Sequence, residues 1–115
     1  MVMRLQFRRS SGNYYLQPSL LKDGTSWTAS NWIVISDVPQ VIELDWRAAS
    51  GVGANDGSLT MWIDGNPVAN LTGVDNDLRN LDLVCLGAVY GIDAGTRGAY
   101  FLDAFESRRN TYIGP

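Results

Sequence analysis

The sequence predicts an all-β protein, built as an antiparallel sandwich or barrel, and three observations carry this prediction. Apolar and polar residues alternate in several runs, as Leu5 and Phe7 do with Gln6, which is the period of a strand with one buried face. Clusters of Gly, Asn and Asp separate these runs, and such residues favour turns because they tolerate positive φ. No window holds the apolar stripe of a helix, so the pattern favours short antiparallel strands.

Nine runs qualify as strands when they are taken in chain order. The first two flank the turn cluster 10–13, and two shorter runs follow the cluster 22–24. The fifth is a separate alternating run, and the next two flank Asp64-Gly65, which is a hairpin signal. Residues 74–82 are expected to form a loop or one helical turn before the last two runs. The strands are therefore expected at 2–9, 13–21, 26–29, 31–36, 40–48, 58–64, 67–72, 80–90 and 98–107.

Composition limits the functions that this chain can have. A single domain over residues 1–115 is expected, and 45% hydrophobic residues suffice for a packed core. The formal charge of −3 and the pI of about 4.6 argue against a nucleic-acid binder that depends on phosphate contacts. The chain has no histidine, which excludes Ser-His-Asp catalysis and His-ligated zinc sites.

The apolar segments are short. The longest spans about ten residues around 84–92, whereas a membrane helix needs ~20, so no membrane span is expected. The first nine residues lack the apolar stretch of a signal peptide. The one cysteine, Cys85, lies in an apolar run and is expected to be a small buried side chain.

The middle and the end of the chain carry a family resemblance. A strand-like run at 41–49 precedes a Gly/Asn-rich loop, a strand that ends in Asp64-Gly65, a short return strand and an aromatic segment around Asp103. This order resembles the concanavalin A-like lectin/glucanase superfamily, in particular laminin-G-like bacterial domains, over residues 2–113. The resemblance implies an antiparallel jelly-roll-like β-sandwich and an extracellular location.

The same resemblance implies that the opening strands of the domain are missing. Such domains are nearly twice as long, and their first and last strands pair. The chain would then be a piece of a longer protein, or a second copy would supply the missing strands. Because an exposed sheet edge must be paired or covered, we expect a fold that is incomplete as a monomer and a homo-oligomer, most simply a two-fold homodimer.

Two carboxylates on one strand face are the strongest catalytic candidates. Alternation places Glu43 and Asp45 on the same side, and retaining glycosidases use two carboxyl groups about 5–5.5 Å apart. The glucanases that the chain resembles carry Glu-x-Asp-x-x-Glu, but the third position here is Ala48. Without this acid, no catalytic residues are expected, and a degenerate glucanase-type glycoside hydrolase is kept as an alternative.

Aromatic side chains on polar faces are the candidates for ligand binding. Trp62 falls out of register with the apolar residues of its run, so it is expected to point away from the core. Sugars stack on such rings while charged groups bind their hydroxyls. The expected binding residues are Trp62, Arg47, Trp32 and Tyr15, although these aromatic rings can equally just cover neighbouring strands. The favoured function is a non-catalytic module that binds carbohydrate, and the alternative is an assembly module without a small ligand.

Acidic loops are candidates for a metal site. Asp56, Asp75 and Asp77 offer the oxygen ligands that calcium prefers, and calcium is common in the superfamily that the chain resembles. Neither the loop with Asp56 nor the loop with Asp75 and Asp77 has the ligand spacing of an EF-hand, and Asp is an ordinary turn residue. No cofactor is therefore expected, with calcium as the alternative.

Overall fold

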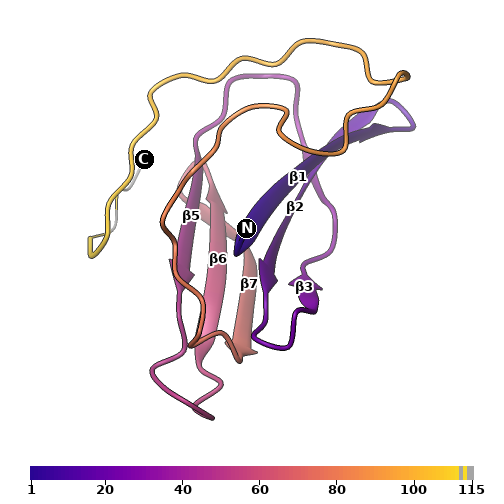
Figure 1. Ribbon diagram of the computed structural model, residues 1–115. Coiled ribbons are helices and arrows are strands. Elements are labelled where there is room, and N and C mark those ends of the chain that lie inside the picture. Colours follow the sequence, from indigo (N-terminus) through magenta and orange to yellow (C-terminus); the bar gives the residue numbers. More distant parts are fainter. Residues whose placement is uncertain (112, 114–115) are drawn as a thin grey trace. The chain divides into compact units, whose positions relative to one another are not determined.

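The computed structural model describes residues 1–111 and 113, and this part of the chain contains seven strands and no helix (Figure 1). It separates into two units, one from Met1 to Asn80 and the other from Leu81 to Ile113. All seven strands lie in the first unit and form two antiparallel sheets, which confirms the predicted all-β class. No helix long and apolar enough to cross a membrane occurs in the described residues.

The first sheet, sheet A, contains β1 (Met3–Ser10), β2 (Asn13–Leu21), β3 (Trp27–Ala29) and β4 (Ile33–Ile35). β1 and β2 form the predicted hairpin, with Ser10 opposite Asn13. The two short strands share the other edge of β2, one after the other. Pro18 lies where this edge passes from β3 to β4, so its missing N–H deprives neither short strand of a ladder hydrogen bond.

The second sheet, sheet B, contains β5 (Ile42–Arg47), β6 (Gly57–Ile63) and β7 (Asn66–Val74), with β6 in the centre. Asp64 and Gly65 form the predicted hairpin turn, and both have positive φ, at 50° and 76°. Along β6, every second side chain is buried. This alternation leaves one face of sheet B for the core and the other for solvent.

The core lies between the inner faces of the two sheets, which gives the first unit a sandwich-like arrangement. One cluster joins Leu16 of sheet A to Met61 and Ile63 of sheet B, and a second joins Leu20 to Leu59 and Val74. Leu44 packs against both clusters. Each sheet is built from strands that are consecutive in sequence. The jelly-roll connectivity that the resemblance implies stays a prediction.

The strands predicted at 80–90 and 98–107 do not form. Residues 81–111, orange to yellow in Figure 1, contain no strand, and Cys85 is exposed rather than buried. A strand-like run becomes a strand only where a neighbouring strand accepts its backbone hydrogen bonds, and no described segment pairs with these two runs. The segment before them is a loop with a turn at residues 77–78.

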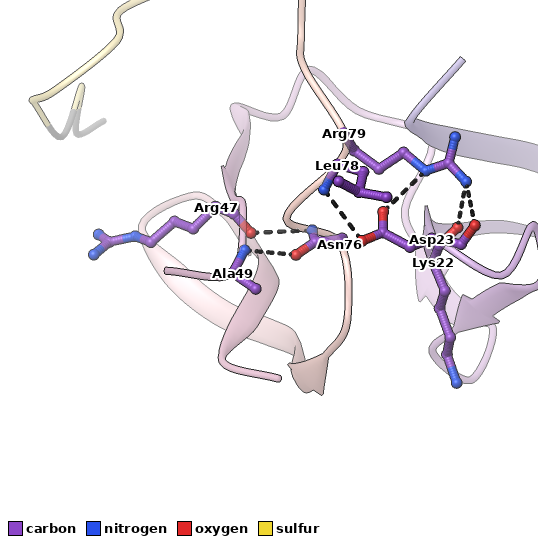
Figure 2. Close-up of polar contacts among 7 residues, drawn as sticks. All are labelled: Lys22, Asp23, Arg47, Ala49, Asn76, Leu78 and Arg79. Atoms are coloured by element: carbon purple, nitrogen blue, oxygen red, sulfur yellow. Dashed lines mark hydrogen bonds and ion pairs between the residues drawn. The ribbon is translucent and has the colours of Figure 1, made fainter. Parts of the chain in front are cut away.

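A buried amide connects this loop to sheet B (Figure 2). Asn76 is completely buried; its Oδ1 accepts a 2.7 Å hydrogen bond from the Ala49 N–H, and its Nδ2 donates one of 3.2 Å to the Arg47 carbonyl. Both partners lie at the end of β5, so the amide satisfies two backbone groups where the chain leaves the strand. Gly57, the first residue of β6, lies directly against Asn76.

The same loop is bound to sheet A through the turn between β2 and β3. Arg79 Nη2 donates to the carbonyls of Lys22 and Asp23, at 2.9 and 2.7 Å, and Arg79 Nε lies 3.3 Å from Asp23 Oδ1. The Leu78 N–H donates to the other carboxylate oxygen of Asp23 at 3.1 Å. The loop from Asp75 to Arg79 therefore bridges the two sheets at one end of the sandwich.

The close approach at Gly57 gives the first prediction. A Cβ at this position would overlap the Asn76 side chain and approach the Val74 carbonyl, so Gly57→Ala should displace the buried amide. We expect the free energy of unfolding, measured by urea denaturation, to fall by about 1–3 kcal/mol. Gly24→Ala is the matched control, because its Cβ would meet nothing within 4 Å and it should change stability by less than about 1 kcal/mol. Equal stability of the two variants would contradict this account of the Asn76 contact.

Candidate functional site

The outer face of sheet B carries a row of polar side chains around one tryptophan. We call this surface the Trp62 face and define it by Glu43, Asp45, Arg47, Thr60, Trp62 and Asn70. The strand register sets Glu43 opposite Trp62, Asp45 opposite Thr60, and Thr60 opposite Asn70. Trp62 is half-buried and lies between Met61 and Ile63, whose side chains are buried on the other side of β6. The indole is therefore part of the outer surface.

Two polar contacts order this surface. The Thr60 hydroxyl donates a 3.0 Å hydrogen bond to Asn70 Oδ1. Arg47 donates to Asp45 Oδ2 from Nη2 at 2.7 Å and from Nε at 3.0 Å, and this hydrogen-bonded carboxylate raises the pKa of the guanidinium. Arg47 keeps 72% of its side chain exposed, so the pair is accessible to a ligand.

The two candidate catalytic carboxylates, Glu43 and Asp45, lie on this face, as alternation predicts. Asp45 is held by Arg47, and the third position of the glucanase pattern, Ala48, follows the end of β5. Alanine supplies no acid there to protonate a leaving group. The catalytic role and the ligand-binding role of this face both stay predictions.

The other two predicted binding residues lie on the outer face of sheet A. Tyr15 is on β2 opposite Arg8, and Trp32 directly precedes β4. Both rings contact the Arg8 guanidinium, whose Cζ lies 3.9 Å from the Trp32 centroid and 5.3 Å from the Tyr15 centroid. The structure thus separates the four predicted residues into two pairs, one on each sheet.

A second arginine–aromatic pair on sheet A was missed in the sequence. Arg4 Cζ lies 4.3 Å from the Trp27 centroid, and Arg4 Nε donates a 3.1 Å hydrogen bond to the Ser19 hydroxyl. The alternation of β1 already places Arg4 and Arg8 on one face. The pairing of Trp27 with Leu21 across β2 and β3 is not visible in the sequence.

The structure brings two of the three predicted metal ligands together and adds one that sequence reasoning missed. Carboxylate oxygens of Asp23, Asp75 and Asp77 lie within 4.8 Å of one another. Asp23 comes from the turn after β2 and already binds Arg79 and the Leu78 N–H. The triad thus lies where the bridging loop meets the turn after β2, and calcium binding stays a prediction.

The third predicted ligand, Asp56, is not part of this triad. Its Oδ1 accepts a 2.7 Å hydrogen bond from the Ser50 N–H, and this bond lowers the pKa of the Asp56 carboxyl. Asp56 thereby closes the loop between β5 and β6, which is the ordinary turn role of this residue type.

Comparison of the chain with protein-family models, with curated proteins and with solved structures found no match. The resemblance to concanavalin A-like and laminin-G-like domains therefore stays a prediction that rests on sequence patterns.

The acidic triad gives a prediction about pH. Partial burial raises the pKa of the Asp77 carboxyl, and the charges of Asp23 and Asp75 raise it further. Because the folded state binds this proton more tightly than the unfolded chain does, stability is lost as pH rises through the raised pKa. We therefore expect Asp77→Asn to be more stable than the wild type at pH 7 in urea denaturation, and this difference should vanish below about pH 3.

Asp37→Asn, which removes an exposed charge outside the triad, is the control and should show no such difference. The measurement is repeated with added calcium. A wild-type stability that rises with calcium, and no longer does so in Asp77→Asn, would show that the triad holds the ion. A less stable Asp77→Asn at pH 7 without calcium would contradict the repulsion within the triad.

Proposed function

We propose that this chain is a non-catalytic binding module that contacts carbohydrate through the Trp62 face. The observation that carries the proposal is one half-buried indole on a strand face whose other side chains on β5 and β6 are polar. The apolar C–H surface of a sugar ring stacks on an indole, and the surrounding polar groups bind its hydroxyls. Such a site needs no cofactor.

The neighbours of Trp62 offer both kinds of hydrogen bond that hydroxyl groups need. Glu43 and Asp45 accept hydrogen bonds, whereas the exposed Arg47 guanidinium donates them. Asn70 has a side-chain amide that donates in addition to the oxygen bound by Thr60. Because these groups come from three adjacent strands, their spacing is set by the sheet and little ordering is needed on binding.

Replacing the indole tests this proposal. Trp62→Ala should weaken binding to neutral polysaccharides such as β-glucan, xylan and galactomannan by about tenfold or more, because stacking on an aromatic ring contributes the largest single contact. Affinity gel electrophoresis with each polysaccharide measures the change. Tyr90→Ala, which removes a ring exposed in the second unit, is the matched control and should bind as the wild type does.

Both variants are compared with the wild type by urea denaturation, so that loss of fold is distinguished from loss of binding. A wild-type protein that binds none of these polysaccharides would overturn the proposal. Undiminished binding by Trp62→Ala would also overturn it, because the site would then lie elsewhere.

A second candidate function, assembly into a homo-oligomer, is favoured by the surface of the second unit. Large apolar side chains are exposed throughout residues 81–111, and Phe101 is 94% exposed. Exposed apolar surface of this extent marks interaction sites in soluble proteins. The exposed residues are Leu83, Val84, Leu86, Val89, Tyr90, Ile92, Tyr100, Phe101, Leu102 and Phe105.

Light scattering tests the assembly function. We expect the mass of a homodimer at micromolar concentration, and we expect Phe101→Asp to shift the equilibrium toward the monomer because it would bury a charge in an apolar contact. Val52→Asp, at an equally exposed position of the first unit, is the control and should leave the dimer intact. A wild-type monomer would rule out assembly and would leave the carbohydrate proposal unaffected.

A further inference from the structure

Positive charge is concentrated at the start of the chain, whereas the chain as a whole is acidic. Residues 1–22 contain Arg4, Arg8, Arg9 and Lys22 but no Asp or Glu, although the chain as a whole has a net charge of −3. Two of these side chains, Arg4 and Arg8, lie on the outer face of sheet A. This face is therefore a basic surface on an acidic protein.

Aromatic rings, not carboxylates, hold these two arginines. Arg47, Arg79 and Arg108 each form an ion pair with an acidic side chain. Arg8 instead lies over Trp32 and Tyr15, and among residues 1–111 and 113 it makes no hydrogen bond or ion pair. Its five N–H donors are thus held in place by the rings and remain available to a ligand.

Arg4 is held in the same way further along β1. Its guanidinium lies over Trp27, and its one hydrogen bond, from Nε to Ser19, leaves the Nη donors unused. Arg8 follows Arg4 by four positions on the same strand, which places their Cα atoms roughly 13 Å apart. Gln6 lies between them on this face, opposite Gln17. The result is a row of donors along an extended strand.

We propose that this row, formed by Arg4, Gln6 and Arg8, binds the carboxylates of an acidic polysaccharide built from uronic acids. A guanidinium fixed by a ring can bind a carboxylate through two parallel N–H···O hydrogen bonds. Its side chain then loses little further conformational entropy on binding. Two such groups four positions apart on one strand suit an extended polyanion better than one small anion. This surface lies on sheet A, so the proposal does not depend on the Trp62 face.

Single-stranded nucleic acid is the competing polyanion, and the ring contacts disfavour it. Proteins bind single strands largely by stacking bases on free aromatic faces. Here the guanidinium groups already cover faces of Trp32 and Trp27, at 3.9 and 4.3 Å. The face therefore offers hydrogen-bond donors rather than stacking platforms.

The test compares two polymers with the same sugar backbone, one with free carboxylates and one with these groups esterified. Binding of the full chain to polygalacturonate and to its fully methyl-esterified form is measured by affinity electrophoresis, with oligothymidylate as a third probe. We expect binding to polygalacturonate alone and a loss of about tenfold or more in Arg8→Gln. Arg8→Lys keeps the charge but not the planar fork, so its affinity should lie between those of the wild type and Arg8→Gln.

Arg97→Gln removes the same charge from an exposed position of the second unit and should bind as the wild type does. No binding to polygalacturonate, equal binding to the ester, or unchanged binding by Arg8→Gln would each overturn the proposal. Tighter binding to oligothymidylate would overturn it in favour of nucleic acid. Trp62→Ala should leave binding to polygalacturonate unchanged, so failure of this proposal is distinguishable from failure of the carbohydrate site on sheet B.

Discussion

The buried amide of Asn76 is the contact on which the rest of the two-sheet unit depends. It satisfies backbone groups of Arg47 and Ala49 where β5 ends, and Gly57 leaves the space that it occupies. The next residues of the same loop bind Asp23 in the turn of sheet A. One short loop thereby holds the ends of both sheets. The two sheets then face each other in one alignment, in which the core clusters form between them.

This alignment also creates two outer faces with different chemistry. On sheet B, Glu43 and Asp45 surround Trp62 with hydrogen-bond acceptors, whereas sheet A presents Arg4 and Arg8 on aromatic supports. Strand alternation explains both faces, because each side chain that leaves the core must lie on the outer surface. The first unit therefore presents two surfaces of different chemistry, and each carries one of the two binding proposals.

Several features of the fold could be predicted because they depend on local pattern. Trp62 was expected to point away from the core, and it lies on the opposite face of its strand from the buried Met61 and Ile63. Seven of the nine predicted strands form. The runs at 80–90 and 98–107 do not form strands, because strand pairing depends on a partner that local sequence does not specify.

The sequence by itself determined the strand class, the hairpins and the side of the strand on which each central residue lies, because a period of two and turn residues act over a few positions. Only the tertiary structure decided which distant groups meet. It brings the carboxylate of Asp23 close to those of Asp75 and Asp77, and it places the Arg8 guanidinium against the rings of Tyr15 and Trp32. It also places Trp62 and Tyr15 on different sheets. Such contacts follow from how strands pair and sheets pack, which is a property of the whole chain rather than of any segment.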